Sequence, residues 1–338
     1  MHRNILMYLL GFSLVLIGGP IGCAPPSFVV RPVFAPERLV PVVVENEAGA
    51  FAPKVAVIEL EGVLLNSRAG GLLGSGENKV ATLQQKLDLA ASDPSVKAVV
   101  LRINSPGGGV TASDIMYRMV EDFRTKSGKP VVAAAQDLCA SGAYYVSLAA
   151  DELIVEDTAL VGSIGVIFTT FDASGLMAKI GVQPNVIKSG KNKDIGSLFR
   201  NMTTAERELL QDLVNDYYGR FRGLVAKKYP LAAAKQEFAD ATDGRVFSGT
   251  RAVELGLASR TGSLDQAIER ARELANIKKS KVIMYRRGVE GGAEQSVYAI
   301  AQPERAPQGS GELSLRITGV GRPITEELPG GFYFLWEP

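Results

Sequence analysis

The sequence predicts an α/β fold, because segments typical of strands alternate along the chain with segments typical of helices. The clearest pair is a helical pattern over 79–91 followed by the apolar strand VKAVVLRI at 96–103. The alternation returns with a strand at 130–135 and a helix from Ser141. Glycine-rich or small-residue breaks follow these strands, and 46% of the residues are hydrophobic. We therefore expect one main domain of layered sheets with flanking helices.

The first residues have the pattern of an export signal. Arg3 precedes an apolar run over 5–17, and small residues lead from there to Cys23. The run is shorter than the roughly 20 apolar residues of a comfortable membrane span. Pro-Ile-Gly-Cys resembles a bacterial lipobox, although Pro20 stands where that pattern prefers Leu. We expect residues 1–23 to be a lipoprotein signal with lipidation at Cys23. The alternatives are an ordinary cleaved signal and an uncleaved anchor.

The expected domain occupies the middle of the chain. Residues 24–53 are rich in Pro and Val and are interpreted as an extended tether, the domain is expected over 54–276, and 277–338 form a C-terminal extension of unassigned role. The remaining expected elements are strands at 54–65, 152–155, 166–171 and 183–188, helices from near Thr111 and over 203–228, and a glycine-rich loop at 70–76. The last helix begins with the capping pattern Thr-x-x-Glu.

Charge, histidine and cysteine content exclude several function classes. Lys and Arg total 37 against 36 Asp and Glu, and no basic stripe interleaved with aromatics marks a nucleic-acid surface. The two cysteines are too few for a zinc cluster or a disulfide framework. The only histidine, His2, lies in the targeting segment, so a Ser-His-Asp hydrolase and the usual histidine-containing zinc sites are excluded. A serine nucleophile here needs activation by Lys, a carboxylate or bound water.

Three segments with small or nucleophilic residues follow strands, where open α/β sheets place their sites. The first is Ser-Pro-Gly-Gly-Gly at 105–109. Three consecutive glycines let backbone N–H groups come close to a ligand and point at an oxygen, as an oxyanion hole requires. A tight turn is the alternative interpretation, and it would be favoured if the motif stood alone.

The second segment is Cys-Ala-Ser-Gly-Ala-Tyr-Tyr at 139–145. Ser141 is flanked there by Ala140 and Gly142, which leaves its hydroxyl open to a substrate at a helix N-terminus that favours negative charge. Serine is also a preferred N-cap residue, and for this segment alone that interpretation is favoured.

The third segment is Lys-Ser-Gly-Lys-Asn-Lys-Asp at 188–194. With no imidazole available, one of its lysines can take the Ser141 proton if desolvation holds the amine neutral. A solvated basic loop is the alternative, and spacing alone does not say which lysine matters.

Five motifs in order resemble those of peptidase family S49, the signal peptide peptidase A group with a ClpP/crotonase-like fold of repeated ββα units. They are LRINSPGGGV, ASGAYYVSLAAD, VGSIGV, KSGKNKD and GRVFSGTRAVELGL, and the resemblance spans about residues 54–275. It implies that Ser141 is the nucleophile and Lys193 the general base, with Lys188 and Lys191 as bystanders.

The same resemblance implies how a peptide is held. The backbone N–H groups of Gly108 and Gly142 would form the oxyanion hole, and the peptide would contact Gly107, Gly109, Ser163, Ile164 and Gly165. No metal or cofactor is needed. The implied enzyme is a serine endopeptidase that degrades remnant signal peptides and other hydrophobic peptides at the membrane. It would be exported and anchored to the cell membrane, facing the periplasm or the cell exterior, with no nucleic-acid partner.

The resemblance also implies assembly. Family members with two homologous halves take the serine and the lysine from different halves, whereas this chain holds one copy of each motif. We therefore expect a head-to-tail homo-oligomer, an octamer by resemblance, in which Ser141 of one subunit faces Lys193 of its neighbour. The helix over 203–228 is a candidate for part of that contact.

Two other functions are compatible with the same sequence. A crotonase-type acyl-CoA enzyme also uses glycine-rich oxyanion loops, but an export signal argues against acyl-CoA chemistry. A catalytically silent, membrane-associated scaffold is the second alternative, and the presence of both Ser141 and Lys193 argues against it.

Overall fold

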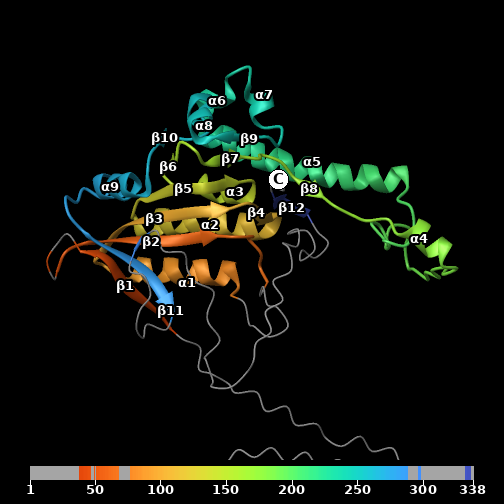
Figure 1. The fold of residues 1–338 in the computed structure, drawn as a ribbon, viewed down its shortest axis with the longest axis horizontal. Helices are drawn as coiled ribbons and strands as arrows, with labels where there is room; N and C mark the ends of the chain where they lie inside the picture. The colour runs from red at the N-terminus through yellow and green to blue at the C-terminus, as the bar shows by residue number, and fades with distance from the viewer. Residues whose placement is uncertain are drawn as a thin grey trace, which may run out of the picture. The chain divides into compact units, whose positions relative to one another are not determined.

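The computed structural model describes residues 38–46, 49, 51–67, 77–287, 296–297 and 332–335. The order of strands along its main sheet is β1 (Leu39–Asn46), β11 (Lys281–Arg287), β2 (Lys54–Glu61), β3 (Val96–Ser105), β5 (Val131–Ala140), β6 (Glu152–Val155) and β10 (Arg260–Thr261). Neighbours along this path are parallel except for β1, which is antiparallel to β11. This sheet with flanking helices confirms the predicted α/β fold (Figure 1).

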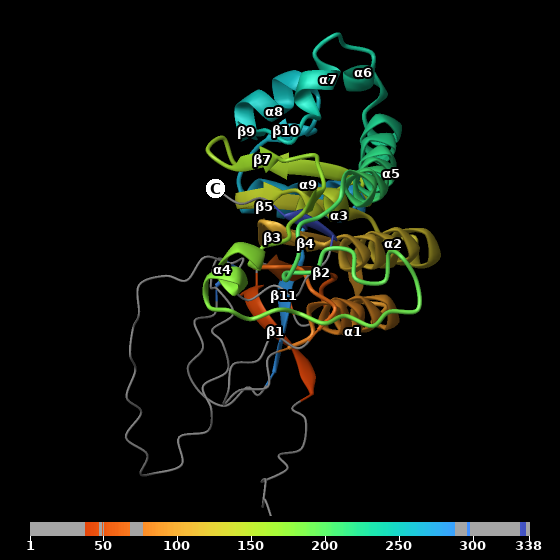
Figure 2. The same cartoon turned by 90° about the vertical axis from the view of Figure 1, so that its right-hand side faces the viewer.

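Helices cover both faces of the sheet. On one face lie α1 (Lys79–Ser92), α2 (Val110–Ser127) and α3 (Gly142–Ser147), and on the other lies α9 (Leu264–Leu274). Strand β3 serves both layers, because successive side chains of a strand point to opposite faces. Leu101 and Ile103 pack with the residues of α1 to α3, whereas Val100 packs with those of α9. Figure 2 shows α1 and α2 stacked on one side of the strands.

The long helix α5 (Thr204–Lys228) begins as the sequence predicts. The hydroxyl of Thr203 accepts a hydrogen bond from the Glu206 N–H, and the Glu206 carboxylate accepts one from the Thr203 N–H. Its C-terminal half is tied to the core through the buried Phe221 and Val225. Its N-terminal half leads away from α3 towards the short helix α4 (Ser174–Lys179), as Figure 1 shows.

Several short strands and helices complete the fold. The chain adds β7 (Leu160–Gly162) beside β5, β9 (Val246–Ser248) beside β7, and the helices α6 (Pro230–Ala233), α7 (Phe238–Ala241) and α8 (Gly249–Leu255). A separate small sheet has the order β4 (Gly107–Gly109), β12 (Phe332–Leu335) and β8 (Ile167–Phe168).

Both ends of the described chain contribute strands to the sheets. Strand β1 falls inside the range 24–53 expected to be a tether, and β11 falls inside the extension 277–338. The Val-rich sequence of β1 favours a strand, and the open edge of β11 supplies its hydrogen-bond partners. The signal segment, Cys23 and the glycine-rich loop at 70–76 lie outside the described residues.

One predicted strand is wrong. Residues 183–188 form no strand, and the side chains of Val186 and Ile187 are exposed. Only Val186 and Ile187 of this segment are apolar and β-branched, Pro184 has no N–H to donate, and no described strand pairs with the segment. The strand expected over 166–171 is confined to Ile167–Phe168 for the same reason, since only these residues pair with β12.

The close contact at Gly249 gives a test of the packing. A Cβ atom on Gly249 would lie 1.9 Å from the carbonyl oxygen of Glu156. Gly249→Ala should therefore lower the free energy of unfolding by about 1–3 kcal/mol, measured as a lower denaturant midpoint. Gly223→Ala in α5 is the control, because a Cβ there meets no atom within 4 Å and alanine favours a helix. Equal midpoints for the two variants would contradict the packing described.

Candidate active site

Ser141 lies on a strained turn between β5, which ends at Ala140, and α3, which begins at Gly142. Its backbone has φ 52° and ψ −116°. A residue other than glycine in such a conformation costs of the order of 1–3 kcal/mol and is held there by its surroundings. The Ser141 N–H donates to the carbonyl of Gly162 at 2.7 Å, which fixes the turn. A strained strand-to-helix turn is one way in which hydrolases present a nucleophilic serine.

The Ser141 hydroxyl does not cap the helix. The residue occupies the N-cap position of α3, but its side chain accepts no capping hydrogen bond. The residue is 1% exposed, and its Oγ atom has no hydrogen-bond partner among the described residues. An unpartnered buried hydroxyl costs about 1–3 kcal/mol, so it calls for an explanation other than capping. The N-cap interpretation of this serine is therefore wrong, and its oxygen is left available for chemistry.

The glycine motif forms strand β4 rather than a tight turn. The Leu64 N–H donates to the carbonyl of Gly107 at 2.8 Å, and the Gly109 N–H donates to the carbonyl of Leu64 at 2.9 Å. A Cβ atom on Gly108 would lie 2.1 Å from the Leu64 oxygen, so only glycine permits this approach. Because alternate residues of a strand turn their N–H and C=O groups to opposite edges, those of Gly108 face away from Leu64. That second edge of β4 is where an oxyanion donor is expected.

The structure brings together Ser141, the glycine strand β4 and the turn over residues 162–165. Helix α3, directly after Ser141, contacts β4. The turn that follows Gly162 is joined to Ser141 by the hydrogen bond already described. In that turn Ser163 has φ 50° and its N–H donates to the Arg245 carbonyl at 2.8 Å. Ile164 is fully buried, so none of its groups is open to a peptide in the structure. Gly165 completes the turn.

Lys193 does not lie beside Ser141. It is exposed, in the segment that joins α4 to α5, and its N–H donates to the Gly190 carbonyl. Figure 1 shows this segment beside α4, beyond the N-terminal end of α5 and away from α3. Since no described residue hydrogen-bonds the Oγ atom of Ser141, the predicted nucleophile and base are not in contact within one chain.

Ion pairs fasten the segment that carries Lys193. Asp194 accepts hydrogen bonds from Lys188 at 2.6 Å and from Arg200 at 2.8 Å, and Arg200 also donates to Glu206 at 2.8 Å. Hydrogen bonds from Arg200 and Lys188 hold the pKa of Asp194 well below its usual range. Those from Arg200 and Thr203 lower the pKa of Glu206 to about 2. Lys188 is thus engaged in an ion pair, and the network ties the segment to the start of α5.

A polar cluster, with Tyr145 buried and Arg220 about half exposed, joins the helices that carry the site. The Tyr145 hydroxyl, in α3, donates to Asp114 of α2 at 2.7 Å. Arg220 of α5 donates to the same carboxylate at 2.6 Å and to the Tyr145 oxygen at 3.0 Å. Burial would raise the pKa of Asp114, but the hydrogen bonds from Arg220 and Tyr145 outweigh it and lower that pKa. Sequence reasoning missed this cluster, because its members are far apart in the chain and form no local motif.

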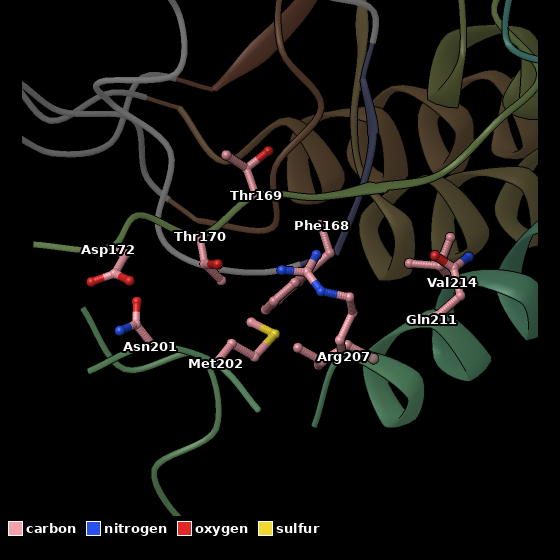
Figure 3. Close-up of a pocket in the computed structure, with 10 residues that line it drawn as sticks. Phe168, Thr169, Thr170, Asp172, Asn201, Met202, Arg207, Gln211 and Val214 are labelled. Carbon is pink, nitrogen blue, oxygen red and sulfur yellow. The ribbon is translucent and has the colours of Figure 1, made fainter. Parts of the chain in front are cut away.

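A cavity of about 490 Å³ lies between the end of β8 and the N-terminal half of α5. Figure 3 shows the Arg207 side chain extending into it. Its lining residues are Phe168, Thr169, Thr170, Asp172, Asn201, Met202, Arg207, Leu210, Gln211 and Val214. None of the predicted catalytic residues is among them. No helix of the described residues has both the length and the apolar character needed to cross a membrane.

Comparisons with known proteins point to one family. Residues 124–278 match the model of peptidase family S49. A Methanocaldococcus jannaschii protein provisionally named a protease is 41% identical, and the match spans 59% of this chain and 63% of that protein. An Enterococcus faecium protein provisionally named a signal peptide peptidase SppA is 31% identical over 73% of this chain and 71% of that protein. A ClpP1 point mutant from Listeria monocytogenes has a TM-score of 0.40 at 15% identity, over 63% of this chain and 94% of that one.

The ion pairs around Asp194 predict how the lysine segment can be released. Arg200→Ala should make residues 188–203 exchange amide hydrogens and accept cleavage by an added protease faster. Both carboxylates have lowered pKa values, so the fastening is complete above pH 4.5 and is lost as the pH falls towards about 2. The control is Arg251→Ala, which removes an exposed pair with Glu254 on α8. Unchanged exchange of 188–203 in Arg200→Ala would show that these ion pairs do not hold the segment.

Proposed function

The chain belongs to peptidase family S49, and on that premise we propose that it is a serine endopeptidase whose Ser141–Lys193 dyad is completed between two subunits. The observation that carries the proposal is the Ser141 hydroxyl, which is buried on a strained turn with no hydrogen-bond partner among the described residues. A nucleophile in this state needs a base, and no described group of its own chain supplies one.

The proposed reaction follows from the groups around Ser141. The Ser141 Oγ atom attacks the carbonyl carbon of the scissile peptide bond, and its proton passes to the neutral amine of Lys193. The N–H groups of Gly108 and Gly142 donate to the oxyanion that forms. Lys193 then gives the proton to the leaving amine, and water hydrolyses the acyl-enzyme.

Exposed apolar side chains support assembly through the α4 region. Phe171, Leu176, Ile180 and Ile187 are all more than half exposed within one short stretch of chain. Exposed apolar groups gathered in this way are typical of a protein interface. In a head-to-tail ring, an octamer by family resemblance, this region of one subunit lies on its neighbour and brings Lys193 towards the neighbour's Ser141. Burial in that junction desolvates the lysine, as its role as a base requires.

The proposed substrates are remnant signal peptides and other hydrophobic peptides held at the membrane. The second edge of β4 is suited to them, because it accepts an extended strand, as its pairing with β12 illustrates. The proposed location is the cell membrane, facing the periplasm or the cell exterior, and the proposal rests on the export-signal pattern and on Cys23 as the site of a lipid anchor.

Membership of a peptidase family favours peptide hydrolysis over the acyl-CoA chemistry considered above. A catalytically silent scaffold is the second candidate, since an assembled ring can also hold peptides without cleaving them. A fluorophosphonate that labels Ser141 separates the two, because only an activated serine reacts.

Loss of either dyad residue is the direct test. Ser141→Ala and Lys193→Ala should each lower kcat for a hydrophobic peptide by about three orders of magnitude or more, because nucleophile and base act as one unit. Lys193→Arg should be equally inactive, since a guanidinium stays protonated. Lys191→Ala is the matched control, because Lys191 is also exposed in the same loop, and it should retain most activity. Normal turnover by a folded Ser141→Ala protein would refute the dyad.

The lipid anchor has a separate test. Cys23→Ser should leave an uncleaved precursor or release the protein from membranes, because a thioether-linked lipid requires the thiol. Metabolic labelling with a lipid precursor should mark the unaltered chain and not the variant. A wild-type chain that takes up no label would instead have an ordinary signal or an uncleaved anchor.

A further inference from the structure

The backbone of Ser141 is held by hydrogen bonds on both sides. Its N–H donates to the carbonyl of Gly162 at 2.7 Å, and its carbonyl accepts from the N–H of Tyr145 at 2.8 Å. The second bond has the i to i+4 spacing of a helix and closes the first turn of α3. Tyr145 therefore fixes the peptide plane that joins Ser141 to Gly142.

That peptide plane carries one of the two expected oxyanion donors. A trans peptide is planar, and its C=O and N–H point in opposite directions. Because the Ser141 carbonyl is aimed along α3 at Tyr145, the Gly142 N–H is aimed out of the N-terminal end of the helix. Gly142 is the first residue of α3, so its N–H has no partner within the helix. A rotation of this plane would turn the donor away from the oxyanion.

The side chain of Tyr145 is anchored outside α3. It is fully buried, and its ring packs edge-on with Tyr117 of α2 at 5.5 Å between centroids and with Phe221 of α5 at 5.0 Å. Its hydroxyl donates to Asp114 of α2 at 2.7 Å. Burial and the hydrogen bond to Asp114 raise the pKa of the phenol, so the hydroxyl keeps its proton and stays a donor. Tyr145 therefore links the backbone of Ser141 to a neighbouring helix.

Asp114 connects this anchor to the second oxyanion donor. The glycine strand β4 leads directly into α2, since Gly109 is the N-cap residue of that helix, and Asp114 lies in the second turn of α2. Gly108 thus precedes α2 as Gly142 opens α3. Helix α3 contacts both α2 and α5, and Figure 2 shows the three helices together. The bond from Tyr145 to Asp114 therefore ties together the starts of the two helices that carry the donors.

Arg220 holds the same bond from a third helix. Its guanidinium donates to the Asp114 carboxylate at 2.6 Å and to the Tyr145 oxygen at 3.0 Å, so it binds both ends of the tyrosine–aspartate pair. Arg220 belongs to α5, whose start is fastened to the segment of Lys193 through Arg200. Because its side chain is about half exposed, its contribution should be smaller than that of the buried tyrosine.

We propose that Tyr145 is a positioning residue which, held by Asp114 and Arg220, orients the Gly142 N–H and so shapes the oxyanion hole of the peptidase. The inference rests on the proposed function, because it concerns the same site. The three side chains act through the Ser141–Gly142 peptide and not through contact with the substrate. The alternative is that they only pack three helices together. Packing sets how many sites are folded, whereas positioning sets how well each folded site binds the transition state.

The first test removes one hydroxyl and keeps the buried ring. Loss of a whole oxyanion donor lowers kcat about 10²- to 10³-fold. Tyr145→Phe loosens the donor without removing it, so kcat per active site should fall about tenfold at unchanged KM. Active sites are counted by labelling to completion with a fluorophosphonate, which leaves misfolded enzyme out of the rate. Tyr117→Phe is the matched control, because its hydroxyl bonds Glu121 within α2, and no change in kcat is expected.

A transition-state analogue gives a readout that packing alone does not move. In a peptide aldehyde complex the Ser141 Oγ atom adds to the aldehyde carbon, its proton passes to Lys193, and the carbonyl oxygen becomes an oxyanion. In Tyr145→Phe the aldehyde should inhibit about tenfold less well, in step with kcat/KM. An uncleaved peptide should bind Ser141→Ala protein equally well with or without the Tyr145→Phe change, because the intact substrate has no oxyanion.

Variants at Asp114 test whether the anchor works through this bond. Asp114→Asn keeps an oxygen that accepts from the Tyr145 hydroxyl, so it should retain more of kcat than Asp114→Ala. If both residues act through one bond, the double variant with Tyr145→Phe and Asp114→Ala should be no slower than the slower single variant. Losses that multiply in the double variant would count against the link.

The outcomes separate this proposal from the proposed function. A Tyr145→Phe enzyme whose kcat per site stays within twofold of wild type, or a Tyr117→Phe enzyme that loses as much, would overturn the positioning role. If no form cleaves peptides or takes the fluorophosphonate, the proposed function fails, and hydrogen exchange decides the positioning alone. The amides of 142–146 should then exchange faster in Tyr145→Phe than in Tyr117→Phe, and equal exchange would overturn the inference. If Tyr145→Phe does not fold, Arg220→Ala replaces it, with a loss in kcat of about threefold expected and an unchanged kcat as the contrary result.

Discussion

The turn at Ser141 is the constraint on which the rest of the site depends. The hydrogen bond from the Ser141 N–H to the Gly162 carbonyl continues the pairing of β5 with β7 into the turn that begins at Ser163. It holds Ser141 in a backbone conformation that residues other than glycine rarely adopt, and the hydroxyl neither caps α3 nor meets a hydrogen-bond partner among the described residues. Because α3 starts at that point and contacts β4, the same turn sets the distance from the serine to the glycine strand.

Much of this arrangement could be predicted from local sequence. The run VKAVVLRI is a buried strand, because a nearly continuous apolar run of this length is typical of a strand covered on both faces. The Thr203 capping box marks the start of α5. The glycine run was expected near the oxyanion, but its conversion into a strand depends on the backbone of Leu64, some forty residues earlier. The N-cap interpretation of Ser141 failed because local propensity ignores the long-range bond to Gly162.

The features that could not be predicted from the sequence are strand pairings between residues far apart in the chain. The aromatic run at 332–335 has high β propensity, but nothing in it indicates that its partners are Gly107–Gly109 and Ile167. The segment 183–188, with Val186 and Ile187 as its apolar residues, has the opposite outcome, since it pairs with no described strand and remains exposed. Its exposure, like that of Lys193, is accounted for if the neighbouring subunit completes both the surface and the dyad. The hydrogen bonds of Asp114 with Tyr145 and Arg220 join α3, which follows the nucleophile, to α5, which follows the segment that carries Lys193.

The central claim is that Ser141 and Lys193 act across a subunit junction, and subunit mixing tests it most directly. Ser141→Ala and Lys193→Ala proteins, each inactive alone, are unfolded together at equal concentration and reassembled, and mixed oligomers are isolated through two different affinity tags. About a quarter of the junctions in random mixtures then contain both wild-type residues, so peptide hydrolysis should return to about a quarter of the wild-type rate. Mixed oligomers that form in full and hydrolyse no peptide would contradict the account and place the base within the same chain as the serine.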